Sequence, residues 1–103
     1  LHRQVFRFGN VAFDLQAHTL TVGNVEETLT PIEFELLNHL IRHRNKACSR
    51  CQLMEASGLG SFEGAERTID VHIHNLRKKI EPDPARPHYI ITESGVGYRL
   101  RME

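Results

Sequence analysis

The chain has 103 residues, enough for one domain with a single hydrophobic core and too few for two. Thirteen basic and thirteen acidic residues give a formal net charge of zero, so bulk charge does not favour a nucleic-acid partner. No apolar run approaches the roughly 18 residues of a membrane span. Two cysteines are too few for a disulfide framework, which favours a reducing cytoplasm.

The charges are unevenly distributed along the chain. Residues 1–41 contain two basic and five acidic side chains, whereas residues 42–103 contain eleven basic and eight acidic ones. An acidic first part and a modestly basic second part are compatible with one positive face. The sequence starts at Leu1-His2-Arg3, without an initiator methionine or a signal peptide, so we expect a piece excised from a longer protein.

The first third of the sequence is typical of short strands. Alternating apolar residues, separated by Gly9-Asn10 and Gly23-Asn24 turns, predict strands over residues 5–8, 11–15, 19–22 and 25–29. These strands are expected to form a small antiparallel sheet.

Two helices are predicted next, each by a capping box. The first helix has Thr30 as its N-cap and Pro31 at its first helical position. Glu33 is the acid of the capping box, whose side chain can accept the N–H of the N-cap residue. The buried stripe of this helix follows at helical spacing: Phe34, Leu37, Leu40 and Ile41. Ser49 and Gln52 form the second box, and that helix ends at residues 57–58, before a glycine-rich loop over 58–64.

A third helix is predicted over residues 65–80, ending before Pro82. At about 100° per residue it has two faces. Its core face holds Ile69, Ile73, Leu76 and Ile80, and its opposite face holds Arg67, Val71, His74 and Lys78, with Asn75 beside them. Thr68, His72, Arg77 and Lys79 lie on the flanks.

The rest of the chain is a proline-rich connector, residues 82–87, and a hairpin. Its strands are expected at 89–92 and 97–100, with a turn over 93–96. The fold class is therefore α+β, with strands, three consecutive helices and a final hairpin, as one domain over residues 1–103.

The exposed face of the third helix suits the major groove of DNA. Arginine and lysine can contact phosphate or guanine, asparagine can pair with adenine, and valine can touch the thymine methyl group. The alternative is a face that is merely solvated. A hairpin following such a helix favours DNA, because it can reach an adjacent groove through Thr92, Ser94 and Arg99.

The sequence closely resembles the OmpR/PhoB-type effector domain of bacterial two-component response regulators. The resemblance covers nearly the whole chain, and it rests on residues 29–37, Ser49-Arg50, Leu53, residues 67–73, residues 76–80 and residues 95–100. It implies a winged helix-turn-helix with an N-terminal antiparallel β-sheet, a three-helix bundle and a C-terminal β-hairpin wing. It also implies a transcriptional regulator that binds double-stranded DNA, in the bacterial cytoplasm, as the output of a phosphorelay. It also implies direct-repeat half-sites, a tandem homodimer on DNA and a receiver domain in the full-length protein.

The resemblance assigns contacts residue by residue. The helix contacts are Arg67, Thr68, Val71, His72, His74, Asn75, Arg77 and Lys78, and the wing contacts are Thr92, Ser94 and Arg99. The loop that can touch RNA polymerase in the family corresponds to Leu59, Ser61, Phe62 and Glu63. Asn75 and Ser94 stand where many members have arginine, so we expect a weaker phosphate contribution and a preference shifted toward adenine.

Two other functions, a zinc site and a protein-binding module, are compatible with parts of the sequence. The residue types and spacing that suit a zinc site are found in four residues: His39, His43, Cys48 and Cys51. Against this site, Cys48 occupies a position where the family pattern has a buried aliphatic residue, and Cys51 is on the next helix. We therefore expect no metal and no cofactor. A winged helix that binds proteins, with only weak DNA binding, remains the alternative function. No phosphate-binding loop, nucleophile elbow or paired carboxylates indicate an enzyme.

Overall fold

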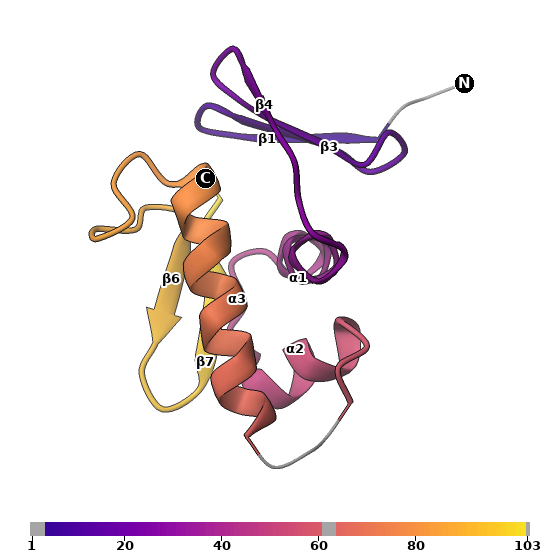
Figure 1. Ribbon diagram of the computed structural model, residues 1–103. Helices are drawn as coiled ribbons and strands as arrows, with labels where there is room; N and C mark the ends of the chain where they lie inside the picture. Colours follow the sequence, from indigo (N-terminus) through magenta and orange to yellow (C-terminus); the bar gives the residue numbers. More distant parts are fainter. Residues whose placement is uncertain (1–3, 61–63, 103) are drawn as a thin grey trace.

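The computed structural model describes residues 4–60 and 64–102, and this part of the chain forms two antiparallel sheets around a group of helices (Figure 1). The predicted fold class is confirmed: an N-terminal sheet, consecutive helices and a C-terminal hairpin follow one another along the chain. No helix among the described residues is long and apolar enough to cross a bilayer.

The N-terminal sheet has the strand order β1-β2-β3-β4. Its strands are β1 (Val5–Phe8), β2 (Val11–Asp14), β3 (Thr19–Val22) and β4 (Val25–Glu27). The second strand ends one residue earlier than predicted because the Asp14 carboxylate accepts the backbone N–H groups of Gln16 and Ala17, which turns the chain. Phe13 and Leu20 point inward, face each other across β2 and β3, and are fully buried.

Helix α1 (Pro31–Arg42) begins as the sequence predicts. The Thr30 hydroxyl accepts the Glu33 N–H, and the Glu33 carboxylate accepts the Thr30 N–H. The predicted stripe is buried together with Leu36, and in Figure 1 α1 lies between the N-terminal sheet and the shorter helix α2 (Arg50–Ala56). The second capping box, Ser49 with Gln52, is also present.

A short strand was not predicted. Strand β5 (Cys48–Ser49) pairs with the last strand, β7 (Gly97–Leu100), which itself pairs with β6 (Ile90–Glu93) in the order β5-β7-β6. Two residues are too few for a periodic pattern, so the sequence carries no signal for β5. Gly97 permits this pairing, because a Cβ there would lie 2.1 Å from the Cys48 carbonyl oxygen.

Helix α3 (Ala65–Ile80) runs beside the β6–β7 hairpin (Figure 1). Its predicted core face is confirmed, since Ile69, Ile73, Leu76 and Ile80 are all at most 1% exposed. Beyond its end, the buried Glu81 carboxylate accepts the backbone N–H groups of residues 88–90. These bonds fold the connector back toward β6, and the strand begins at Ile90, one residue later than predicted.

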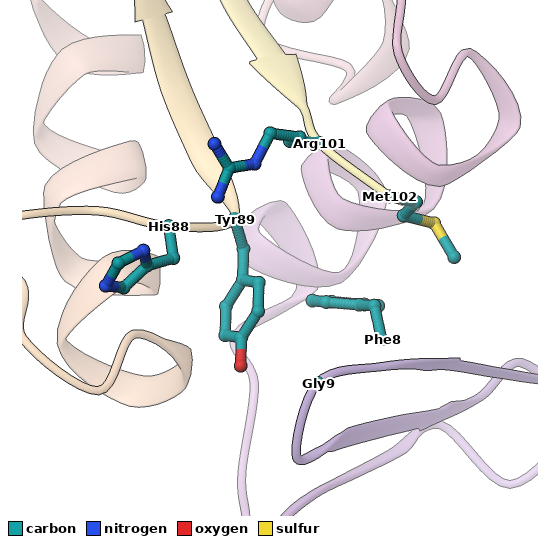
Figure 2. Close-up of a pocket in the computed structure, with 6 residues that line it drawn as sticks. All are labelled: Phe8, Gly9, His88, Tyr89, Arg101 and Met102. Atoms are coloured by element: carbon teal, nitrogen blue, oxygen red, sulfur yellow. The ribbon is translucent and has the colours of Figure 1, made fainter.

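The N-terminal sheet meets the C-terminal hairpin at a ring contact shown in Figure 2. The rings of Phe8 and Tyr89 pack edge to face with centroids 5.2 Å apart. The Tyr89 hydroxyl lies over Gly9, which has a φ of +53°, so a larger residue there would be strained and would displace the Tyr89 ring. A cavity of about 250 Å³ opens beside this contact, lined by Phe8, Gly9, His88, Tyr89, Arg101 and Met102.

Candidate nucleic-acid interface

The solvent side of α3 carries most of the residues expected to bind DNA. Arg67, Val71, His74 and Lys78 are exposed, and Val71 is 56% accessible although it is apolar. To one side of these four exposed residues lie three half-buried ones, Asn75, Thr68 and His72. The structure therefore places seven of the eight predicted helix contacts on one continuous face. The eighth, Arg77, lies outside this face.

Arg77 lies on the flank of α3 that faces the hairpin. Its Nε and Nη2 donate to the Ile90 carbonyl oxygen at 3.1 and 2.7 Å, and Nη2 also donates to Thr92 Oγ1 at 2.8 Å. The guanidinium carbon lies 5.3 Å from the centroid of the Tyr98 ring. Arg77 thus joins the helix to the hairpin, a role that its place in a basic run does not reveal.

A second contact between α3 and the hairpin centres on Asp70. Its Oδ1 accepts the Tyr98 hydroxyl at 2.5 Å and the Arg50 Nε at 2.8 Å. Burial, and then the hydrogen bond to Asp70, raise the pKa of Tyr98, and the same carboxylate raises the pKa of Arg50. This three-residue network holds α2, α3 and β7 together, and sequence reasoning assigned no role to Asp70.

The opposite flank of α3 is fixed to α1. The Lys79 ammonium donates to the Thr28 carbonyl oxygen at 2.7 Å and to Glu33 Oε1 at 2.5 Å. Of the basic run Arg77-Lys78-Lys79, Lys78 is exposed, whereas both neighbours bond within the domain. The run therefore presents less free positive charge to solvent than its sequence indicates.

The hairpin places the predicted wing residues unevenly. Thr92 and Ser94 are exposed, but the Arg99 Nε lies 2.6 Å from Glu93 Oε1, so its charge is largely offset. Val96 at the turn is 49% exposed. The wing is accordingly close to neutral.

The loop compared with the RNA polymerase contact is only partly described. Leu59 is half-buried, packs against the core, and donates its N–H to the Met54 carbonyl oxygen. Ser61, Phe62 and Glu63 lie outside the described residues.

The four residues considered for zinc do not converge. The ring centroids of His39, on α1, and of His43, the C-cap residue of α1, are 4.4 Å apart. Cys48 is buried in the core, and Cys51 is exposed on α2. Within residues 4–60 and 64–102, no three side chains of the metal-binding types His, Cys, Asp and Glu come together. Burial, then His43, then Arg42 lower the pKa of His39.

Helix α2, the turn after it, helix α3 and the β6–β7 hairpin together define a winged helix-turn-helix domain. Residues 24–100 match the family described as "Transcriptional regulatory protein, C terminal". The chain belongs to this family.

Among curated relatives, the chain is 38% identical over 96 residues to the sensory transduction protein RegX3 of Mycolicibacterium smegmatis, covering 93% of this chain and 42% of RegX3. It is 38% identical over 97 residues to the KDP operon transcriptional regulatory protein KdpE of Escherichia coli, covering 93% of this chain and 43% of KdpE. The chain thus spans less than half the length of these relatives.

Two solved structures share the fold over almost the whole chain. The response regulator DrrB of Thermotoga maritima, described as an OmpR/PhoB homolog, superposes with a TM-score of 0.85 at 33% identity, over 94% of this chain and 44% of DrrB. The RstA DNA-binding domain of Klebsiella pneumoniae, solved in complex with the RstA box, gives a TM-score of 0.84 at 26% identity, over 95% of this chain and 97% of that one.

Proposed function

We propose that this domain binds double-stranded DNA sequence-specifically, as the output domain of a two-component transcriptional regulator. The observation that carries the proposal is the exposed face of α3, where cationic and hydrogen-bonding side chains surround one exposed valine beside a projecting hairpin. A thymine methyl group in the major groove can cover the Val71 side chain, which is 56% accessible.

The side chains of this face divide into two roles. Arg67 and Lys78 are exposed and form no ion pair among the described residues, and we assign them to phosphates. Val71, His74 and Asn75 lie between them and are assigned to base edges, with Asn75 as an adenine reader. Thr68 and His72 flank this set, and Thr92, Ser94 and Arg99 form the wing contribution.

The partners of the whole protein follow from family membership as proposals. A receiver domain precedes this domain in the full-length protein, and two copies bind direct-repeat half-sites as a tandem homodimer. Avidity between two linked copies offsets the small number of free cations on each. The loop at Leu59 and residues 61–63 contacts RNA polymerase. We assign the domain no enzymatic step.

A second candidate is a module that binds protein rather than DNA. The zero net charge, the Glu93–Arg99 pair and the exposed Val96 favour this candidate, because they give a wing with little attraction for phosphate.

In vitro selection of bound duplexes from a random pool, carried out at two salt concentrations, separates the two functions. Sequence-specific binding enriches a half-site at both salt concentrations, and the affinity falls as salt rises. A pool that stays random after repeated selection contradicts the proposed function and supports the protein-binding module.

A further inference from the structure

A cavity lies where the N-terminal sheet meets the C-terminal hairpin, on residues to which the proposed function gives no role. Its volume is about 250 Å³, and it opens beside the ring contact between Phe8 and Tyr89 (Figure 2). None of the residues that line it is an expected contact of DNA or of RNA polymerase: Phe8, Gly9, His88, Tyr89, Arg101 and Met102. A role for this cavity is therefore independent of the exposed face of α3.

Two basic side chains of the cavity are available to a ligand. Arg101 and His88 are exposed, and their side chains form no hydrogen bond or ion pair within residues 4–60 and 64–102. The bonds that these two residues do make use their backbone N–H groups, which donate to the Tyr89 carbonyl oxygen and to the Glu81 carboxylate. No acidic side chain of the described residues lines the cavity. Its basic end is therefore suited to an anion.

Two side chains fix the backbone of the cavity walls. The buried Glu81 carboxylate accepts the N–H groups of residues 88–90 at 2.7 to 3.1 Å. The Asn45 amide donates to the Met102 carbonyl oxygen at 2.8 Å and accepts the Met102 N–H at 2.9 Å. Because these bonds hold both walls in place, a ligand gives up less free energy to order the site.

The rest of the lining is apolar. In Figure 2 the guanidinium of Arg101 and the imidazole of His88 lie on one side of the Tyr89 side chain. Phe8 and Met102 lie on the other side. A ligand that lies across the Tyr89 ring therefore meets basic groups at one end and apolar groups at the other. An aromatic ring and a thioether are both favourable partners for a second ring.

We propose that this cavity binds a small organic acid, a carboxylate joined to one apolar ring. The Arg101 guanidinium offers parallel N–H donors that match the two oxygens of a carboxylate, and the His88 imidazole adds a further donor. The ring of the acid packs against Phe8 and Met102. Ligand cavities usually measure ~300–1,000 Å³, so a volume of about 250 Å³ limits the acid to a single ring.

The bound acid links two parts of the domain. One wall of the cavity belongs to the N-terminal sheet, and the other belongs to the residues that flank the hairpin. A ligand that contacts both walls binds the folded domain and not the unfolded chain, so it stabilises the fold.

Benzoate is the probe, because it is the simplest acid of this class. Its binding is followed in the absence of DNA by two-dimensional amide NMR spectra and by thermal unfolding. Benzoate should give saturable shifts at the amides of residues 8–9, 88–89 and 101–102, and it should raise the unfolding temperature. Acetate lacks the ring and benzyl alcohol lacks the charge, so each should bind at least about 10-fold more weakly. Equal effects of the three compounds would overturn the proposal.

Two arginine variants test the basic end of the cavity. Arg101→Gln removes the guanidinium and keeps the backbone N–H that bonds to Tyr89. It should weaken benzoate binding about 10-fold and leave the unfolding temperature without benzoate unchanged, because only a charge-assisted bond to the ligand is lost. Arg86→Gln is the matched control, since Arg86 is also exposed but does not line the cavity. It should change the affinity by less than about twofold.

The comparison of the two variants decides the proposal without reference to DNA binding. If Arg86→Gln weakens benzoate binding as much as Arg101→Gln does, the acid responds to the general positive charge of this region and not to the cavity. Benzoate that binds Arg101→Gln as tightly as the wild-type domain also overturns the proposal.

Discussion

The ammonium group of Lys79, in the last turn of α3, lies 2.5 Å from Oε1 of Glu33, in the first turn of α1. The same Oε1 atom accepts the Thr30 N–H and completes the capping box. The Glu33 side chain is only 3% exposed and that of Lys79 is 26% exposed, so solvent screens this pair weakly. One carboxylate therefore caps one helix and anchors the helix that is proposed to enter DNA.

Lys79→Met should lower the free energy of unfolding by about 2–3 kcal/mol, because it leaves a buried carboxylate with one cationic partner fewer. Adding Glu33→Gln should recover part of this loss, since the amide needs no counter-charge. Urea denaturation at constant m-value measures both effects. Lys78→Met is the control, because Lys78 is exposed; a loss as large as that of Lys79→Met would contradict the ion pair's role.

Tyr98→Phe should destabilise the domain by about 1–2 kcal/mol, because the Asp70 carboxylate loses a charge-assisted hydrogen bond. In the wild-type protein the pKa of Tyr98 is raised above its ordinary value of 10.0. Folding thus favours the protonated phenol, so this stabilisation is full below pH 10 and is lost as the pH rises through the folded-state pKa. Phenolate absorbance in a Tyr89→Phe background measures the pKa of Tyr98. A titration midpoint at or below 10 contradicts the network of Asp70, Tyr98 and Arg50.

The parts of the fold that depend on neighbouring residues in the sequence could be predicted. Both capping boxes and the four core positions of α3 follow from spacings of three and four residues, and all are confirmed. Strand β5 could not be predicted, because its two residues pair with a strand almost fifty positions away. The bonds of Arg77 and Lys79 were also missed, since helical spacing places a side chain on a flank without indicating which carbonyl or carboxylate lies there.

The expected base and phosphate contacts of α3 stay predictions. The structure adds that seven of the eight lie on one face of the helix, whereas Arg77 bonds to the hairpin. That face was predictable because the four buried residues fix its direction. The near-neutral charge of the wing could not be predicted, because the side chains of Glu93 and Arg99 pair only after the hairpin forms.

His39 should titrate below its ordinary pKa of 6.5, because burial, then His43, then Arg42 disfavour its charged form. The folded state therefore binds fewer protons than the unfolded state, so stability is full above pH 6.5 and falls as the pH drops through the folded-state pKa. NMR titration of the imidazole measures this pKa. His43→Gln should raise it without restoring 6.5, since burial remains; an unchanged pKa in that variant contradicts the coupling of the two rings.

Lys78→Ala should weaken binding to all duplexes and reduce the slope of log affinity against log salt by about one, because one phosphate contact is lost. Lys79→Ala should leave that slope unchanged, since its ammonium is occupied by Glu33 and Thr28. Fluorescence anisotropy over a range of salt concentrations, below the unfolding temperature of each variant, compares them. Equal changes of slope would show that both lysines contact phosphate.

Asn75→Ala should cost about 1–3 kcal/mol at one base step and relax the selected half-site at that step, because an amide that pairs with adenine is removed. Asn75→Arg tests the same position in the opposite direction. A longer cation should increase the affinity for all duplexes, steepen the salt slope by about one and shift the preferred base toward guanine. Repeating the selection with both variants measures these changes. If Asn75→Ala weakens cognate and random duplexes equally, Asn75 does not read a base, and the specificity of this face rests on Val71 and His74.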